Sequence, residues 1–350
     1  MRPARTMANL RLVIEKTELS ALAGEYGLPK LAAASGPIEG WGNRRYALET
    51  SKGRFELRVH TPEQEADLRR ELDFLVFLEK NNFPSPRLLS DRRGRQIIDF
   101  AGHFLVLFKV PAGRCATNEN LTLHEINTFG HLLGQMHMLS RNYKKTIENR
   151  FAFDRIFETY ADVRRRMPVY FKKIVRTLDE ETEYLGNYLE TKLPKGIIHG
   201  ALYRGNVLFK DDGVTCISGF CDACRGKYIY DLATAVNAMC FNEGSYLLDR
   251  FEALMAGYES IRTLSLAEWD SFPNELRFAA LRFSVSRLHE FFDAEGDEAD
   301  RINEEFREYL QRLRVLRRER EGGMEGLLMA MATGYDYRKY QRVKPGEEEE

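Results

Sequence analysis

The sequence predicts an α+β fold in which a small lobe built on an antiparallel β-sheet precedes a larger, mainly helical lobe. Three observations predict it: strand-like runs joined by short glycine-containing turns fill the first part of the chain, helical periodicity dominates afterwards, and 350 residues suit two lobes. We expect the first lobe over residues 15–110, the second over 111–315, and a charged, disordered tail over 316–350.

The first lobe alternates strands with two helices. Gly27 ends the first helix, Gly53 lies in a hairpin turn, and Pro84 and Pro86 break the second helix, whose apolar residues share one face. In chain order we expect a helix over 17–26, strands over 46–50 and 54–60, a helix over 68–80, and strands over 95–100 and 103–110.

The second lobe is helical with one interruption. Periodicity predicts helices over 123–141, 160–177, 180–191, 245–262 and 274–292. Between them, an apolar run at 197–199 precedes strands over 206–210 and 214–218, which flank a turn at Asp211-Asp212-Gly213. A loop and hairpin among helices is an unusual arrangement, so its residues are the first candidates for function.

Composition excludes several classes of partner. Lys and Arg total 52 and Asp and Glu total 53, so there is no overall basic charge to attract nucleic acid or an anionic membrane surface. The longest apolar run stops at Lys109 and the first seven residues carry no secretion signal. We therefore expect a cytoplasmic protein whose five cysteines are reduced.

The interruption carries the spacing of a kinase catalytic loop, His-x-Asp followed by Asn. His199 and Asn206 occupy the first and last positions of that pattern. In phosphoryl transfer the Asp orients and deprotonates the acceptor hydroxyl, while the Asn holds a metal ion from the same loop. A second Asp, just before a Phe, then chelates the metal that bridges the nucleotide phosphates.

Several segments resemble homoserine kinase of the aminoglycoside-phosphotransferase and choline-kinase-like type. They are Gly196 to Phe209, Gly219 to Cys224, Tyr230 to Asn237 and Ala279 to Leu288, in the family's order. The resemblance covers residues 15–315 and implies a protein-kinase-like two-lobed fold, ATP and Mg²⁺ as cofactors, and an amino alcohol such as homoserine as substrate.

Both carboxylates of that pattern are missing. Ala201 stands where the family has its catalytic Asp, and Gly219 stands where it has the metal-chelating Asp. Neither side chain can accept a proton or bind Mg²⁺, which leaves Asn206 as the matching metal ligand and weakens ATP and Mg²⁺ binding. Asp222 is a candidate substitute, but its offset of three from Gly219 is unfavourable on a strand.

The nucleotide side is also altered. Gly36, Gly40 and Gly42 precede a strand, so the turn could cover phosphates, although a plain hairpin turn is an equal alternative. The resemblance places Arg58 where related kinases carry a phosphate-binding Lys, with Glu71 as its ion-pair partner.

Other candidates have structural alternatives. His199 and Asp231 are better interpreted as braces of the loop backbone, while Asn206 could equally cap the turn. Arg282 and Arg287 could receive the carboxylate of an amino acid or form salt bridges within the lobe. Cysteines 216, 221 and 224 have spacing that formally suggests a metal site, but we favour small buried side chains; for histidines 131, 137 and 289 we favour packing or interface roles.

Three functional hypotheses remain. The favoured hypothesis is a pseudokinase with lost or strongly reduced activity that binds a small molecule, an amino acid or nucleotide, or a regulatory protein partner. The alternative is an active ATP-dependent small-molecule kinase acting on homoserine or a similar amino alcohol, with its missing groups replaced elsewhere. A third, different chemistry in the same cleft, would use His199, Asn206, Asp222 and Cys221.

Overall fold

A computed structural model describes residues 12–40, 43–294 and 296–318, and the chain divides into two compact units. Unit 1 comprises Met1–Ala116 and Gly205–Cys221, and unit 2 comprises Thr117–Arg204 and Asp222–Glu350. Residues 205–221 thus group with the N-terminal part of the chain, whereas the sequence analysis placed the whole catalytic-loop hairpin in the second lobe.

Unit 1 is built on an antiparallel sheet of order β1-β2-β3-β6-β4, with β5 also paired to β6. The hairpin between β2 and β3 has the predicted turn, since Thr50 pairs with Gly53. The elements are α1 (Lys16–Glu25), β1 (Ala33–Gly40), β2 (Asn43–Thr50), β3 (Gly53–His60), α2 (Glu65–Lys80), β4 (Arg87–Leu88), β5 (Ile98–Phe100), β6 (His103–Val110) and β7 (Arg114–Cys115).

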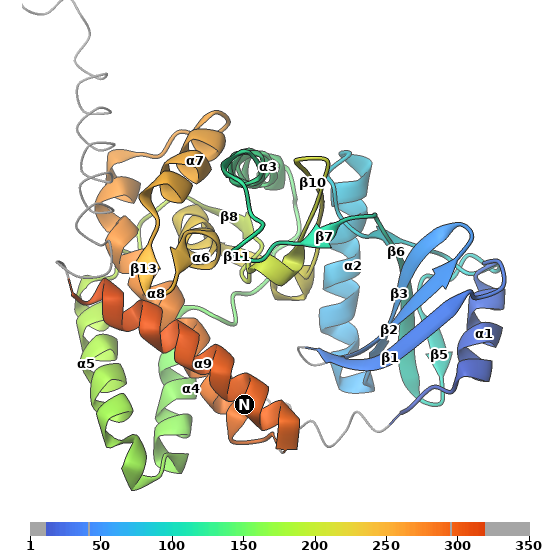
Figure 1. The fold of residues 1–350 in the computed structure, drawn as a ribbon, viewed down its shortest axis with the longest axis horizontal. Helices are drawn as coiled ribbons and strands as arrows, with labels where there is room; N and C mark the ends of the chain where they lie inside the picture. Colours follow the sequence, from blue (N-terminus) through green and yellow to red (C-terminus); the bar gives the residue numbers. More distant parts are fainter. Residues whose placement is uncertain (1–11, 41–42, 295, 319–350) are drawn as a thin grey trace, which may run out of the picture. The chain divides into compact units, whose positions relative to one another are not determined.

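Strand alternation gives this sheet two different faces, covered by α1 and α2 (Figure 1). Leu57 and Leu107, paired across β3 and β6, belong to the apolar cluster that includes Leu19 and Leu22 of α1. Arg58 follows Leu57 on β3 and therefore points to the opposite face of the sheet, toward α2. The sheet is therefore the middle of three layers.

Residues 205–221 form a hairpin of β9 (Val207–Lys210) and β10 (Gly213–Ile217), and β9 also pairs with β7. Its turn residues Asp211 and Asp212 have φ of 50° and 61°, a conformation that Asp tolerates better than most residues. The backbone N–H of Ile217 donates to the Pro84 carbonyl at 2.8 Å, and the Phe220 ring packs edge-on against Phe74. These contacts explain why the hairpin groups with unit 1.

Unit 2 is mainly helical. Every residue of α6 is buried, so α6 is its central helix. A short ladder pairs β8 with β11 antiparallel. The elements are α3 (Leu123–Ser140), α4 (Phe153–Arg166), α5 (Lys172–Tyr188), β8 (Lys195–Ile198), β11 (Cys224–Lys227), α6 (Tyr228–Met239), β12 (Phe241–Asn242), β13 (Ser245–Tyr246), α7 (Leu248–Glu259), α8 (Leu266–Phe291) and α9 (Gly296–Leu316).

Several of the expected helix boundaries are wrong. The segment expected as a helix over 180–191 belongs to α5, and the helix expected over 245–262 begins at Leu248, after β13. The predicted helix over 160–177 is broken into α4 and α5, because Pro168 lacks an N–H and pushes Met167 to extended geometry with ψ of 123°. The helix expected over 274–292 begins earlier, at the capping box of Ser265 and Glu268.

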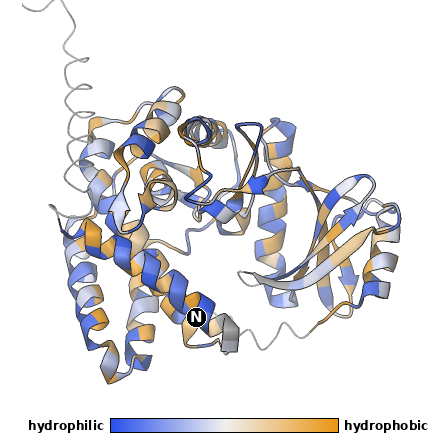
Figure 2. Cartoon of the chain, viewed as in Figure 1, coloured by the Kyte–Doolittle hydropathy of each residue, from blue (hydrophilic) through white to orange (hydrophobic). Residues whose placement is uncertain are grey.

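Helix α9 was missed altogether because its sequence is dominated by charge. Its buried apolar residues Ile302, Phe306, Leu310 and Leu313 nevertheless recur every three or four positions. Figure 2 shows the mixed hydrophilic and hydrophobic colouring typical of an amphipathic helix along α9. Of the charged tail expected over 316–350, residues 319–350 lie outside the described residues.

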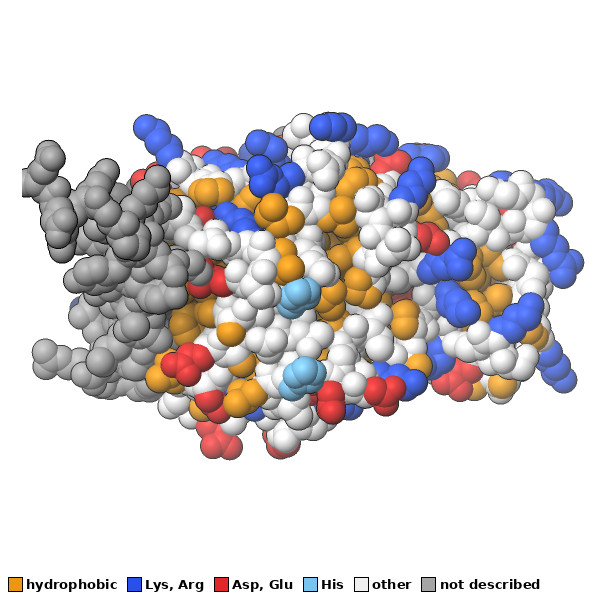
Figure 3. All heavy atoms as spheres, turned by 90° about the horizontal axis from the view of Figure 1, so that it is seen from above, with side chains coloured by type: hydrophobic (Ala, Val, Ile, Leu, Met, Phe, Trp, Pro, Cys, Tyr) orange, Lys and Arg blue, Asp and Glu red, His pale blue; other side chains and the backbone are white. Residues whose placement is uncertain are grey.

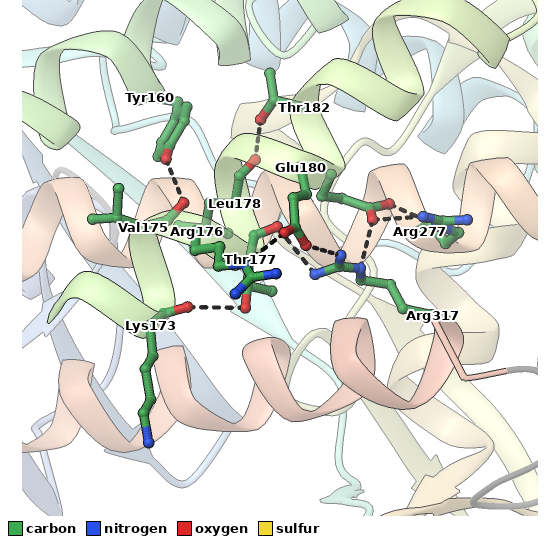
Figure 4. Close-up of polar contacts among 11 residues, drawn as sticks. Tyr160, Lys173, Val175, Arg176, Thr177, Leu178, Glu180, Thr182, Arg277 and Arg317 are labelled. Atoms are coloured by element: carbon green, nitrogen blue, oxygen red, sulfur yellow. Dashed lines mark hydrogen bonds and ion pairs between the residues drawn. The ribbon is translucent and has the colours of Figure 1, made fainter.

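The end of α9 is joined to α5 by charged side chains (Figure 4). Arg317 donates to the Thr177 carbonyl at 3.2 Å and pairs with Glu180 at 2.5 Å. It also lies 3.4 Å from Glu181, a fully buried carboxylate that Arg277 of α8 holds with two hydrogen bonds of 2.7 and 2.6 Å. Glu181 therefore links three helices.

Charge on the surface is mixed. Figure 3 shows basic side chains scattered over one face, with acidic and apolar side chains between them. No helix within residues 12–318, gaps excepted, has the length and apolar content needed to cross a membrane.

Candidate functional site

The loop motif runs across both units, with His199 and Ala201 in unit 2 and Asn206 in unit 1. In unit 2, strand β8 ends at Ile198 and leads directly into the motif. Gly200 then turns the chain with φ of 79°, and a Cβ there would lie 2.6 Å from the backbone carbonyl oxygen of Asp222. Only glycine can turn the chain this close to the backbone of Asp222.

Asp231, on the first turn of α6, holds the backbone of this loop. Its two carboxylate oxygens accept hydrogen bonds from the backbone N–H groups of His199 and Gly200, at 2.7 and 2.8 Å. The His199 ring is fully buried, and its Nδ1 accepts from the N–H of Ala201 at 3.3 Å. The contacts of His199 and Asp231 are therefore those of residues that shape the loop.

Behind Asp231 lies a buried polar network that sequence reasoning missed. His137 of α3 places Nε2 at 3.2 Å from Asp231 Oδ2 and Nδ1 at 2.7 Å from the Tyr258 hydroxyl. Burial lowers the pKa of His137 against the opposing pull of Asp231, so the ring is held neutral. Tyr258 is in turn contacted by Arg262, which pairs with Glu268 at 2.6 Å. No local motif marks these residues, since they meet only through helix packing.

The carboxylate of Asp222 is held by two arginines. Asp222 is 4% exposed, and its Oδ1 accepts from Arg150 while its Oδ2 lies 3.3 Å from Arg282 Nη2. Ala201 is also buried and presents only a methyl group. The charge of the candidate substitute is thus already balanced within unit 2.

The two arginines expected to receive a substrate carboxylate are both buried. Arg282 is fully buried, with its guanidinium 3.8 Å from the Phe151 ring centroid and 4.1 Å from that of Phe283. Arg287 pairs with Glu290 at 2.6 Å and with Glu305 at 2.7 Å. Protein carboxylates therefore contact both guanidinium groups, as the salt-bridge alternative expects.

In unit 1, Asn206 and Gly219 face each other across the base of the hairpin. The Ser218 N–H donates to the Asn206 carbonyl at 2.8 Å, which brings the following residue beside the Asn206 side chain. Gly219 has φ of 86°, and a Cβ there would lie 2.5 to 2.7 Å from the Asn206 amide atoms. Because that amide ends a short rotatable side chain, an added side chain would displace it rather than the backbone.

Arg58 and Glu71 form the ion pair expected from the resemblance. Arg58 Nη1 lies 2.8 Å from Glu71 Oε1, its Nε lies 2.5 Å from Glu56, and its guanidinium stacks over Phe108. Burial by itself lowers the pKa of Arg58. The carboxylates of Glu56 and Glu71 have the larger combined effect, and the pKa is raised above its ordinary value. Arg58 is therefore anchored to the sheet and α2 by protein carboxylates.

The glycine-rich segment forms the hairpin of β1 and β2, in which Gly40 pairs with Asn43. Gly36 has φ of 126°, a conformation that favours glycine. Gly42 lies outside the described residues, so the expected phosphate-covering turn stays a prediction.

The described residues offer no cluster of metal-binding side chains. They contain no group of three or more His, Cys, Asp or Glu side chains placed to hold a metal ion. Burial raises the pKa of both Cys216 and Cys224 to about 12, which keeps these thiols protonated. Their environment is that of small buried hydrophobic side chains.

Comparison with known proteins identifies the relatives of this chain. The pattern of the phosphotransferase enzyme family matches residues 35–264. A homoserine kinase of Caulobacter sp. is 32% identical over 79% of this chain and 86% of its own length, and one of Methylobacillus flagellatus is 30% identical over 78% and 84%.

Solved structures with the same fold share less sequence. Amicoumacin kinase in complex with AMP-PNP and Ca²⁺ has a TM-score of 0.66 and 15% identity, over 85% of this chain and 93% of that protein. A microcompartment-associated aminopropanol kinase has a TM-score of 0.57 and 20% identity, over 87% and 97%. These protein-kinase-like neighbours establish an α+β fold and agree with the fold class expected from sequence.

Proposed function

Because the chain belongs to the phosphotransferase enzyme family, we propose that it is a homoserine-kinase-like pseudokinase with lost or strongly reduced phosphotransferase activity and a ligand-binding or regulatory role. The observation that carries this proposal is the chemistry at two positions, where Ala201 and Gly219 replace the carboxylates that the family uses. A missing general base alone removes about two to four decades of rate.

The surroundings of Asp222 support the same conclusion. To act as base or metal ligand, its carboxylate would have to leave both Arg150 and Arg282. Breaking a buried ion pair costs roughly 3–5 kcal/mol when one partner is left uncompensated. Asp222 is therefore a poor substitute for either missing group.

The residues present do not fit a catalytic Mg²⁺. Magnesium requires oxygen ligands in octahedral geometry and is usually held by one or two carboxylates. In unit 1, the two positions that hold the metal in the family are occupied by Asn206, which offers an amide, and by Gly219, which offers only a hydrogen. We accordingly derive no catalytic step through a metal ion or through ATP.

The first test is turnover. Purified chain is mixed with ATP, Mg²⁺ and a panel of homoserine, choline and ethanolamine, and ADP is measured. We expect no substrate-dependent ADP above the rate without substrate. Turnover on the order of one per second on any of them would show an active kinase and reject the proposal.

The second test restores the carboxylates. The double variant Ala201→Asp with Gly219→Asp should produce substrate-dependent ADP, because it restores the general base and the metal ligand. Asp is also among the residues that best tolerate the positive φ of Gly219. The matched control is Ala201→Asn with Gly219→Asn, which adds nearly the same bulk and similar backbone strain without carboxylates. Equal rates in both double variants would contradict our explanation of the lost activity.

A further inference from the structure

Two arginines from distant parts of unit 2 converge on Asn118. Arg204 Nη1 donates to the Asn118 Oδ1 at 2.5 Å, and Arg250 Nη1 donates to the same oxygen at 3.3 Å. Arg250 Nη2 also donates to the Asn118 backbone carbonyl at 2.7 Å. Arg312 of α9 donates to the Asn237 carbonyl, two residues before the Met239 carbonyl that accepts from Arg250. We call Arg204, Arg250 and Arg312 the arginine triad.

The triad is close enough for its charges to repel. Burial lowers the pKa of Arg204, and the positive charges of Arg312 and Arg250 lower it further, against the pull of Glu308. Arg250 is 8% exposed and Arg312 is 4% exposed, so water screens their charges weakly. Like charges gathered at this depth destabilise the fold unless something neutralises them.

The surrounding protein neutralises the triad only in part. Glu308 pairs with Arg312 at 3.2 Å but is 60% exposed. The last carbonyls of α6, at Asn237 and Met239, accept from Arg312 and Arg250, and a helix C-terminus supplies about half a negative charge.

Two further carboxylates lie near the triad. Glu119 is exposed, and its pKa is lowered mainly by hydrogen bonds at Thr117 and its own backbone, with Arg204 and Arg250 adding to the effect. Asp249 accepts the backbone N–H of Arg250. These carboxylates are exposed to solvent, and within the described residues neither Arg204 nor Arg250 makes an ion pair with a carboxylate, so the charge of the triad is only partly neutralised.

We propose that the arginine triad binds an oxyanion, the carboxylate or phosphate group of a small metabolite. The planar guanidinium fork matches the two oxygens of either group, and a bound oxyanion would supply the missing negative charge. The inference rests on the proposed ligand-binding role and deepens it by naming the ligand class. It also assigns to Arg204, Arg250 and Arg312 the recognition that the sequence analysis expected of Arg282 and Arg287.

The test is equilibrium binding to the full chain without nucleotide. Calorimetric titration with L-homoserine and, separately, with inorganic phosphate is compared with sodium chloride at equal ionic strength. We expect saturable binding of at least one probe, and dissociation constants at least tenfold weaker for Arg204→Gln. Homoserine alone, phosphate alone or both binding would distinguish a carboxylate site, a phosphate site and a general oxyanion site.

Two further variants separate binding from folding. Arg165→Gln is the matched control, because Arg165 is 73% exposed and makes one surface ion pair with Asp162; its affinity should equal that of the unmodified chain. Arg204→Lys keeps the charge without the fork and should bind with intermediate affinity at an unchanged melting temperature.

Removing a repelled charge should leave the ligand-free melting temperature of Arg204→Gln unchanged or higher. The inference is overturned if neither probe binds more tightly than chloride, or if Arg204→Gln and Arg204→Lys both bind as the unmodified chain does. The binding titration contains no nucleotide, so its outcome is independent of the turnover assay. Kinase turnover would reject the proposed function without changing the result of the titration.

Discussion

Asp231 is the residue on which the polar contacts of the loop at 199–201 converge. Each carboxylate oxygen accepts one backbone N–H group, and Oδ2 also meets the buried ring of His137. The neutral ring can donate from Nε2 to Asp231 while Nδ1 accepts from the Tyr258 hydroxyl, which satisfies both nitrogens. Protonation would force Nδ1 to donate as well and would place a charge in a buried site.

The stability of the protein should therefore depend on pH through His137. Its pKa in the fold is lowered relative to the unfolded chain, so its contribution is present above the unfolded pKa of about 6.5 and is lost as pH falls below it. The loss is at most about 1.4 kcal/mol per pH unit for one linked proton.

The measurement is urea unfolding at several values between pH 5 and pH 8. His137→Gln is the comparison, because Gln can donate and accept hydrogen bonds but cannot titrate. We expect the free energy of unfolding to fall more steeply with acid in the unmodified chain than in His137→Gln. Identical slopes would show that His137 is not held neutral by the fold.

Among the elements, α3 and α7 approach each other through glycines. A Cβ on Gly257 would lie 1.9 Å from the carbonyl oxygen of Asn127, and one on Gly130 would lie 2.2 Å from that of Leu254. Both obstacles are backbone atoms, which cannot rotate away. Close approach of these two helices also brings His137 to Tyr258, so the packing of α3 on α7 positions the network behind Asp231.

Gly257→Ala should separate the two helices and destabilise the protein by roughly 2–4 kcal/mol. The matched control is Gly186→Ala in α5, where the nearest side-chain atom, on the Phe153 ring, would lie at 3.7 Å. There, Ala should stabilise by about 0.5–1 kcal/mol through helix propensity. Chemical denaturation of the two variants measures both changes, and a stable Gly257→Ala chain would refute the close-packing argument.

The attachment of α9 depends on two adjacent glutamates with different burial. Glu181 is fully buried between Arg277 and Arg317, whereas the side chain of Glu180 is 44% exposed. Glu181→Gln should destabilise the protein by about 3 kcal/mol, because two arginines lose their buried partner. Glu180→Gln, the matched control, should change stability by less than about 1 kcal/mol. Equal effects in denaturant would mean that the buried carboxylate does not anchor α9.

At the scale of the whole molecule, the two units divide the kinase motif, and each contains one of the two positions where the resemblance expects a carboxylate and the sequence has none. Unit 2 carries Ala201 and the arginine-bound Asp222, while unit 1 carries Gly219 beside Asn206. A kinase needs both groups, since one acts on the acceptor and the other holds the metal. A single restored carboxylate should therefore recover little activity.

Nucleotide binding, if retained, should not depend on magnesium. We expect any rise in melting temperature caused by ATP to be the same with Mg²⁺ and with EDTA, because neither Ala201 nor Gly219 offers a metal ligand. The double variant Ala201→Asp with Gly219→Asp should regain a larger shift with Mg²⁺. A magnesium-dependent shift in the unmodified chain would point to a metal site outside the family pattern.

The sequence alone determined the fold class and the family, because both depend on local features: strand alternation, helical periodicity and a motif confined to some twenty residues. It missed α9 because charge dominates that segment, and it overlooked the break that Pro168 imposes locally between α4 and α5. Only the tertiary structure decided the partners of Asp222, His137 and Arg204. Arg150 lies 72 positions before Asp222, and Asn118 lies 86 before Arg204. Contacts over such separations arise from packing of whole helices, which no single segment specifies.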